Sequence, residues 1–387
     1  MKSLTASSLT VIIIIVMQIV FTIAQEDQAA LNTLENVLEF LEKEINSQSD
    51  SISLVVGIAN EDGSLEEDFS YNADAALPLA STIKIVVLAA YAQEVVEGNL
   101  DPRTPVSTSD WEAYYLPFTD GNAHPAALEA LSVKMDELGF SVESQDVTLD
   151  DIANAMIMHS DNAATDYLMN LVGEEALQRV IDENNLEAQD LPFSFLGAYL
   201  ATQNHTEPTL KIYSKAELRE AAAEHQALYL NDSSWREAEL EWLQTLTTFG
   251  PYAQQIERSQ SFAKGSAADY AEIMAGVVTE TFISPEVSQI MRPILEWPMQ
   301  VPGNNEIYET FGAKGGTLAG ILPNAFYLIP RSGDYEGEKR VVVLFLNDLS
   351  EKNFYDLNES FANQFAMLEL ATNSQTLEPL LAAQQSE

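Results

Sequence analysis

The segment from Ser81 to Ala92 constrains the fold of this chain more than any other part of the sequence. It reads Ser-Thr-Ile-Lys-Ile-Val-Val-Leu-Ala-Ala-Tyr-Ala and is apolar on nearly every side of a helix. A helix that is apolar all round must be surrounded by other elements of its domain. The segment therefore predicts a central, buried helix that starts at Ser81 and carries Lys84 on the same face, one turn later.

The composition limits both the sources of stability and the classes of partner. The 387-residue chain contains no cysteine, so no disulfide and no lipid-modified cysteine can form, and stability must come from the core. It carries 60 acidic and 18 basic residues, a formal net charge of −42 at pH 7. Electrostatic repulsion between this negative charge and other polyanions makes nucleic acids and anionic lipid surfaces poor partners. The simpler interpretation is that the acidic residues only keep the surface well solvated.

The N-terminus has the pattern of an export signal. An uncharged apolar run from Leu9 to Ala24 follows Lys2, and small residues precede Gln25. We expect a signal peptide over residues 1–24 and hence a secreted, extracellular or periplasmic protein, with no stable membrane insertion after cleavage. The alternative is an uncleaved membrane anchor, although the run is short for a bilayer span of about 20 residues.

Periodic patterns predict that both ends of the chain contribute to one sheet. Apolar residues at helical spacing between positions 31 and 45 predict a first helix, and residues 53–59 predict a strand that enters a hairpin turn. Further strands are predicted at 307–313, 324–329 and 340–346, followed by a last helix at 353–371. The residues between them are mostly helical in pattern, which predicts a helical block inserted into a sheet-containing domain.

Three short motifs carry the candidate chemistry. They are Ser81-Thr82-Ile83-Lys84, Ser160-Asp161-Asn162 and Lys314-Gly315-Gly316-Thr317. Each motif alone also fits a simpler role. The first can be a helix cap followed by a surface lysine, the second a helix start, and the third a glycine-rich turn. The first pattern recurs at Ser261 and Lys264, but no buried helix is predicted to continue from that second match.

Taken together, the motifs contain the groups that acyl transfer requires. The Lys84 amine can reach the Ser81 hydroxyl, and burial together with a second cation lowers a lysine pKa from about 10.4 toward the range of a useful base. The Ser160 hydroxyl can pass a proton to a leaving group, and the Asn162 side chain can hold a substrate amide.

The third motif provides candidate groups for binding the substrate. Lys314 can attract a carboxylate and lower the pKa of Lys84, while Gly316 and its neighbouring glycine let a substrate lie along the strand edge. The backbone amides of Ser81 and Thr317 can form an oxyanion hole. The four histidines show no metal-ligand spacing.

In the order and context of these motifs, the chain resembles the penicillin-recognising serine hydrolases, specifically the class A β-lactamase-like family. The resemblance extends over nearly the whole chain after the signal. It implies an α/β (α+β) three-layer sandwich, with an antiparallel five-stranded sheet flanked by helices and an all-helical lobe beside it. It also implies an acyl-enzyme on Ser81 that needs no metal and no cofactor. We expect a single hydrolase domain over residues 25–375 and a C-terminal tail over 376–387.

The chain departs from that family in three respects. Gly315 stands where the third motif usually has a threonine or serine. The stretch 190–199 contains no glutamate, whereas class A enzymes place a water-activating glutamate in the corresponding loop. The motifs are also unusually far apart, and the excess includes a helical insertion at about 206–265, which is a lid, an interaction surface or a stabilising flap.

The resemblance implies a small-molecule substrate, most directly a β-lactam amide or another acyl compound with a carboxylate. The alternatives are a D-amino-acid peptidase or penicillin-binding protein that acts on cell-wall peptides, an esterase, and a non-catalytic binding protein on the same fold. The missing glutamate predicts a long-lived acyl-enzyme, because water then lacks its usual activating group.

Overall fold

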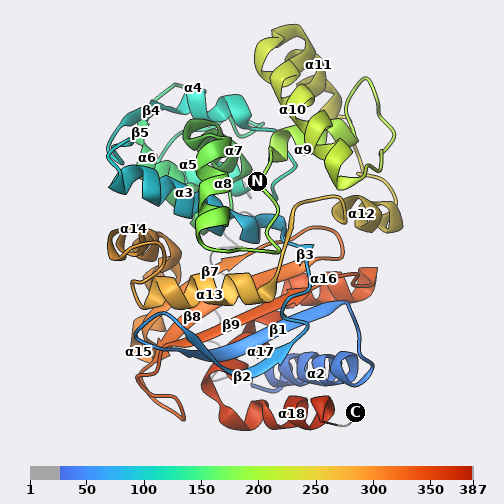
Figure 1. Ribbon diagram of the computed structural model, residues 1–387. Helices are drawn as coiled ribbons and strands as arrows, with labels where there is room; N and C mark the ends of the chain where they lie inside the picture. The colour runs from blue at the N-terminus through green and yellow to red at the C-terminus, as the bar shows by residue number, and fades with distance from the viewer. Residues whose placement is uncertain (1–26, 386–387) are drawn as a thin grey trace, which may run out of the picture.

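The computed structural model describes residues 27–385, so the signal peptide predicted at 1–24 lies outside the described residues. Its centre is a five-stranded antiparallel sheet with the strand order β2-β1-β9-β8-β7 (Figure 1). The strands are β1 (Ile52–Ala59), β2 (Leu65–Tyr71), β7 (Tyr308–Gly315), β8 (Leu322–Pro330) and β9 (Arg340–Leu346). Both ends of the chain thus share one sheet, as the sequence predicts.

Helices cover both faces of this sheet, which makes three layers (Figure 1). One face packs on α2 (Asp27–Asn46), α16 (Glu351–Ser360), α17 (Ala362–Thr372) and α18 (Glu378–Gln384). The other face packs on α13 (Ala267–Val278) and α14 (Pro285–Leu295), with the short α15 (Asn304–Ile307) next to β7. Because both faces are covered, β9 is buried at every position, which explains its continuous apolar run.

A lobe built mainly of helices lies beyond α13 and α14. It contains α3 (Lys84–Val96), α4 (Thr108–Trp111), α5 (Ala123–Ala130), α6 (Leu149–Asn154), α7 (Asn162–Val172) and α8 (Glu174–Glu183). The first ten residues of α3 are all buried, so the prediction of a central buried helix is confirmed. Its start is not as predicted, because Ser81 lies in a preceding 3-10 turn, Ala80–Ile83, and α3 begins at Lys84.

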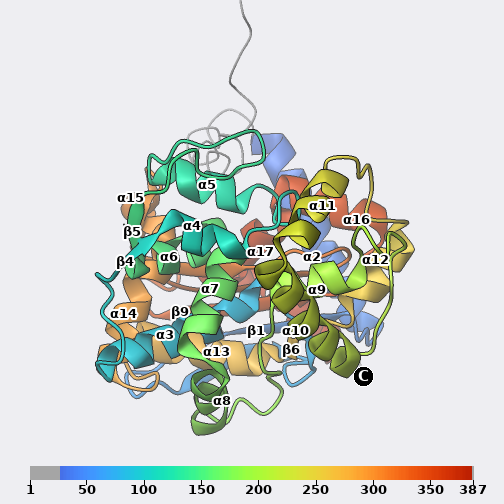
Figure 2. The same cartoon turned by 90° about the horizontal axis from the view of Figure 1, so that it is seen from above.

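The predicted insertion belongs to a larger excursion over residues 190–264. Its two ends meet where the Asp190 amide donates to the Lys264 carbonyl at 2.8 Å, and the Lys264 amide donates to Asp190 Oδ2 at 2.8 Å. It contains α9 (Phe195–Thr202), α10 (Lys215–Asn231), α11 (Ser233–Leu243) and α12 (Tyr252–Ser259), which gather beside the helical lobe (Figure 2). A Cβ on Gly197 would lie 2.0 Å from the Ala222 carbonyl oxygen, so only glycine lets α9 and α10 approach this closely.

Two short strand pairs complete the structure around the lobe. They are β3 (Leu77–Pro78) with β6 (Lys264–Gly265), and β4 (Pro105–Ser107) with β5 (Asp146–Thr148). The last predicted helix is two helices, because Phe361 adopts a φ of 56° between α16 and α17. In the part of the chain that the structure describes, no helix is both long and apolar enough to cross a membrane.

Candidate active site

Ser81 lies at the junction between the sheet and the helical lobe, in the 3-10 turn before α3. The preceding residue, Ala80, has a φ of 45°, which a residue with a Cβ seldom adopts. The turn is tied to the sheet because the Thr82 hydroxyl donates to the Pro323 carbonyl at 3.1 Å. Ser81 itself is only partly buried.

Lys84 follows one turn later and is fully buried. Its Nζ donates to the Ser160 carbonyl at 2.6 Å and to Asn162 Oδ1 at 2.7 Å, and it lies 3.4 Å from Ser160 Oγ. Burial lowers the pKa of this amine to about 7, against the opposing effect of nearby carboxylates, of which Asp161 is the strongest. Within the described residues Lys84 makes no hydrogen bond to the Ser81 hydroxyl, so the second motif orients this amine.

Lys314 reaches the same serine from the other side. It lies near the end of β7, is 3% exposed, and its Nζ donates to Ser160 Oγ at 2.9 Å and to the Gly315 carbonyl at 2.6 Å. Burial, and then the charge of Lys84, lower the pKa of the Lys314 amine well below its ordinary value. The Ser160 hydroxyl therefore lies between two buried amines whose protons are both weakly held.

The turn that carries Ser160 and Asn162 is anchored by Asp161. Ser160 adopts a φ of 65°, and the buried Asp161 caps α7 by accepting the amide N–H of Ala163 at 2.7 Å and that of Ala164 at 3.2 Å. The second oxygen of Asp161 bonds Nδ1 of His124 at 2.8 Å. The capping role follows from the sequence pattern, but the histidine comes from α5 and is not indicated by any local pattern.

The end of β7 lies against the Ser81 turn. A Cβ on Gly316 would lie 2.6 Å from the Ser81 backbone nitrogen and 2.8 Å from the Leu79 carbonyl oxygen, so this position requires glycine. Among the described residues, neither the Ser81 amide nor the Thr317 amide has a hydrogen-bond acceptor. Two free N–H groups near one strand end are the arrangement that an oxyanion hole requires.

Gly315 also has a structural explanation, which its neighbour across the sheet provides. It pairs with Asn324 of β8, and a Cβ on Gly315 would lie 2.4 Å from Asn324 Oδ1. The buried Asn324 side chain therefore occupies the space that a larger side chain at position 315 would need. The Thr317 side chain is exposed and its hydroxyl lies 3.5 Å from Asn358 Oδ1.

The start of α9 covers the amine of Lys84. The Phe195 ring centre lies 5.0 Å from Lys84 Nζ, within the range of a cation–π contact. Asp166, one turn after Asn162 on α7, holds this segment by accepting the Phe195 amide at 2.9 Å, the Leu196 amide at 2.7 Å and the Ser194 hydroxyl at 2.9 Å. Burial raises the pKa of the Asp166 carboxyl to about 6, although these hydrogen bonds oppose the shift.

The structure thus brings most of the sequence-predicted site residues together. Lys84, Ser160, Asn162 and Lys314 are linked by hydrogen bonds, and Gly316 touches the Ser81 turn. The second Ser-x-x-Lys match lies elsewhere, with Lys264 in β6. Among the described residues, no group of three or more histidine, aspartate or glutamate side chains is arranged to hold a metal ion.

Comparisons with known proteins give one match at the level of sequence families. Residues 39–300 match the model of the Beta-lactamase2 family, described as a beta-lactamase enzyme family. No curated protein matches the chain in sequence.

Solved structures that are similar in fold include β-lactamases and a protein named PBP-A. A β-lactamase from Sphaerobacter thermophilus is 17% identical, with a TM-score of 0.49 over 86% of this chain and 97% of that one. A class A β-lactamase representative from Bacteroides cellulosilyticus is 12% identical, with a TM-score of 0.48 over 88% of this chain and 98% of the other. PBP-A is 14% identical, with a TM-score of 0.47 over 85% and 96% of the two chains.

Proposed function

Since the chain belongs to the beta-lactamase enzyme family, we propose that it is an exported serine hydrolase that forms an acyl-enzyme on Ser81. Its substrate is a small acyl compound with a carboxylate, most directly a β-lactam amide. The proposed protein consists of a signal peptide (1–24), one hydrolase domain (25–375) with its helical insertion, and a C-terminal segment (376–387). Cleavage of the signal would release it outside the membrane or into the periplasm.

In the proposed acylation step, neutral Lys84 accepts the proton of the Ser81 hydroxyl as Ser81 Oγ attacks the substrate carbonyl. A pKa of about 7 supports this role, because a large share of the amine is then neutral at physiological pH. The C–N bond of the substrate breaks as the tetrahedral intermediate collapses. Ser160 gives its proton to the leaving nitrogen and is reprotonated through the lysines on either side of it.

The remaining groups bind the substrate in this proposal. The Ser81 and Thr317 amides donate to the developing oxyanion, and the Asn162 side chain holds the amide of the acyl group. Lys314 attracts the substrate carboxylate, and Gly316 keeps the strand close to Ser81. The observation that carries the proposal is the position of Ser160 Oγ, which lies 2.9 Å from Lys314 Nζ and 3.4 Å from Lys84 Nζ.

A second candidate function is a penicillin-binding or D-amino-acid peptidase-like enzyme that releases β-lactams slowly. It is favoured by the contact between Phe195 and Lys84, because the residue that covers this amine is an aromatic ring and offers no carboxylate to activate water. A non-catalytic binding protein on this fold is the third candidate, and two features favour it, namely Gly315 and the absence of a glutamate at 190–199.

Intact-mass spectrometry after exposure to a fluorescent penicillin tests these functions together. We expect an adduct on the wild-type protein and none on Ser81→Ala. Rapid loss of the adduct would identify a β-lactamase, whereas an adduct that persists for hours would favour the penicillin-binding enzyme. No adduct at any pH would contradict acyl transfer to β-lactams, and unchanged ligand affinity in Ser81→Ala would then favour a binding protein.

A further inference from the structure

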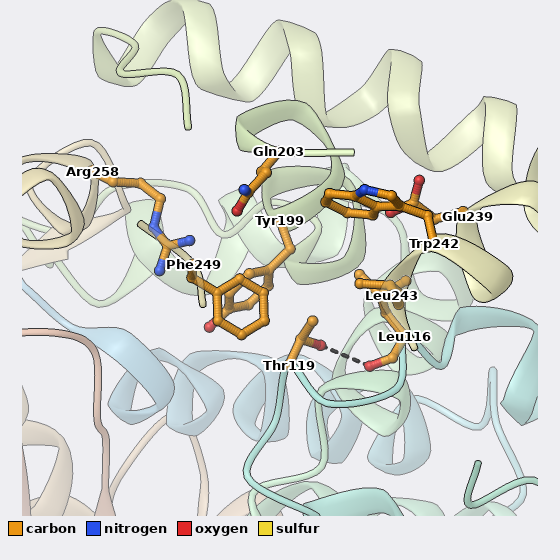
Figure 3. Close-up of a pocket in the computed structure, with 9 residues that line it drawn as sticks. All are labelled: Leu116, Thr119, Tyr199, Gln203, Glu239, Trp242, Leu243, Phe249 and Arg258. Carbon is orange, nitrogen blue, oxygen red and sulfur yellow. Dashed lines mark hydrogen bonds between the residues drawn. The ribbon is translucent and has the colours of Figure 1, made fainter. Parts of the chain in front are cut away.

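The helices of the excursion over residues 190–264 pack on one short segment of the helical lobe, residues 112–116. Leu116 of this segment is buried in a hydrophobic cluster whose other buried members all come from the excursion, namely Leu196, Leu200, Tyr229 and Leu243. Figure 3 shows part of this contact, with Leu116 and Thr119 next to side chains of α9 and α11. The inserted helices therefore cover segment 112–116 from the outside.

Two side chains of the inserted helices also bind the backbone of segment 112–116. The Tyr229 hydroxyl, on α10, donates to the Tyr115 carbonyl at 2.8 Å, and Arg236 Nη2, on α11, donates to the Glu112 carbonyl at 3.0 Å. The guanidinium carbon of Arg236 lies 4.7 Å from the centre of the Tyr229 ring, so the two donors also contact each other. Tyr229 is fully buried, and a buried hydroxyl that lost its acceptor would carry a desolvation cost. These bonds fix the segment to the insertion.

The inner side of segment 112–116 holds His124. The Tyr115 ring stacks on the imidazole with ring centres 4.2 Å apart, and Glu112 Oε1 lies 3.8 Å from His124 Nε2. The Trp111 ring meets the same imidazole edge-on, with ring centres 4.8 Å apart. His124 is fully buried, so these contacts hold its Nδ1 in place 2.8 Å from Oδ2 of Asp161.

Asp161 connects His124 to Ser160, its neighbour in the sequence. Ser160 adopts a φ of 65°, which a residue with a Cβ keeps only where surrounding contacts enforce it. The hydrogen bonds of Asp161 to His124 and to the start of α7 are such contacts. A continuous series of contacts thus leads from Tyr229 to the turn that carries Ser160.

We propose that the inserted helices α10 and α11 position the turn of Ser160, with Tyr229 and Arg236 as the positioning residues. The inference rests on the proposed acyl transfer, in which Ser160 protonates the leaving nitrogen. Both residues act through segment 112–116 and His124. Among the roles that the sequence leaves open for the insertion, this assigns it that of a stabilising flap that supports the site.

The leaving group of the substrate provides a readout that depends on Ser160. When the C–N bond of a β-lactam breaks, the nitrogen must take up a proton, which Ser160 supplies in the proposed reaction. A thioester breaks a C–S bond instead, and its thiolate leaves without a proton because the pKa of a thiol is only about 8.5. Misplacement of Ser160 therefore slows acylation of Ser81 by a β-lactam more than acylation by a thioester whose thiol carries a carboxylate.

Two variants remove the contacts between the insertion and segment 112–116. Tyr229→Phe deletes only the hydroxyl, and we expect the ratio of the acylation rates, β-lactam over thioester, to fall about tenfold. Arg236→Met lies on a half-buried position of α11 and should lower the ratio in the same direction. In Ser160→Ala the ratio should be lowest, and adding Tyr229→Phe should lower it no further, because the positioned hydroxyl is already absent.

Two matched controls change the insertion without altering a contact to segment 112–116. Tyr213→Phe also removes a hydroxyl that donates to a backbone carbonyl, that of Ala201 at 3.2 Å, but this bond lies within the excursion. Arg219→Met removes a charge from α10, where Arg219 pairs with Glu174. Both should leave the ratio unchanged. An equal loss of both rates in Tyr229→Phe, or the same fall of the ratio in the controls, would overturn the positioning role.

Hydrogen exchange tests the positioning without any reaction. The amides of Ala163 and Ala164 donate to Asp161, so their exchange in the folded protein, followed by mass spectrometry, reports how firmly the turn is held. We expect faster exchange in Tyr229→Phe and Arg236→Met than in the wild-type protein, and no change in the two controls. Unchanged exchange in both variants would overturn the proposal whatever the acylation rates. Faster exchange in a protein that neither probe acylates would support the positioning and contradict the reaction.

Discussion

Nδ1 of His124 lies 2.8 Å from Oδ2 of Asp161, and neither side chain is exposed to solvent. This pair lies directly behind the turn that carries Ser160 and Asn162, because Asp161 is the middle residue of that turn. Burial, the largest single effect, lowers the pKa of His124, but the charge and hydrogen bond of Asp161, together with Glu112 and Asp120, outweigh it and bring the pKa to about 9. Burial likewise raises the pKa of Asp161, and His124, the Ala164 amide and the charge of Lys84 together turn that shift into a net lowering. The pair is therefore an ion pair at neutral pH.

The first prediction concerns this ion pair. The pKa of His124 is higher in the folded protein than in the unfolded chain. The contribution of protonated His124 to the free energy of unfolding is therefore complete below about pH 6.5 and is lost as the pH rises through about 9. We expect His124→Gln to lower the free energy of unfolding by about 3 kcal/mol at pH 6.5 and to flatten its decline toward pH 9.5. Denaturant titrations across this range measure both effects, and an equally steep decline in the variant would contradict the assignment.

The second prediction concerns the base. With a pKa of about 7 for Lys84, the acylation rate should rise with pH from 5 to about 7 and then level off, because only the neutral amine accepts a proton. The arginine in Lys84→Arg cannot lose its charge, so this variant should be acylated by the labelled penicillin about 10²- to 10⁴-fold more slowly than the wild-type protein. Stopped-flow labelling with a fluorescent penicillin measures the profile, with the same substitution at an exposed lysine, Lys352→Arg, as the matched control. A flat profile would argue against Lys84 as the base.

The third prediction concerns the ring over Lys84. Phe195→Glu places a carboxylate where the ring now lies, so that water near the acyl-enzyme gains an activating group. We expect the adduct of this variant to decay at least about tenfold faster than that of the wild-type protein. Phe195→Ala opens the same space without a carboxylate and should change the decay less. Equal decay in the Glu and Ala variants would show that water access alone limits hydrolysis.

The fourth prediction concerns the contact between β7 and the Ser81 turn. In Gly316→Ala the added Cβ meets backbone atoms of the turn at 2.6 and 2.8 Å, so Ser81 must move relative to the strand. We expect a loss of about 1–3 kcal/mol in stability and about 10²-fold in labelling rate. Gly315→Ala is the comparison, because its Cβ meets the end of the Asn324 side chain, which can turn aside. Similar labelling losses in both variants would contradict a specific role for Gly316.

Sequence patterns predicted the fold well where they were long and periodic. The apolar run after Ser81, four of the five strands and the first helix were predicted correctly because burial on one or both faces leaves a direct periodicity in the chain. The break at Phe361 between α16 and α17 was missed, because an aromatic residue at positive φ carries no local signal.

The candidate site divides in the same way. The motifs identified Lys84, Ser160, Asn162 and Lys314, and in the structure a chain of hydrogen bonds links these four side chains. The expectation that burial lowers the pKa of Lys84 agrees with the structure, where burial is the largest cause, and the charge of Lys84 also lowers the pKa of Lys314. The extent of that burial is a property of the packed chain, because it depends on segments far from Lys84 in the sequence.

By itself, the sequence determined the order of the elements, the three motifs and the absence of a glutamate at 190–199, because each is a local pattern. Only the tertiary structure decided which distant groups support them. His124 behind Asp161, Asp166 beneath the start of α9 and the Tyr229 hydroxyl on segment 112–116 all depend on contacts between segments far apart in the chain. Such contacts depend on how helices and strands pack. Packing brings together side chains whose positions in the sequence show no recognisable pattern.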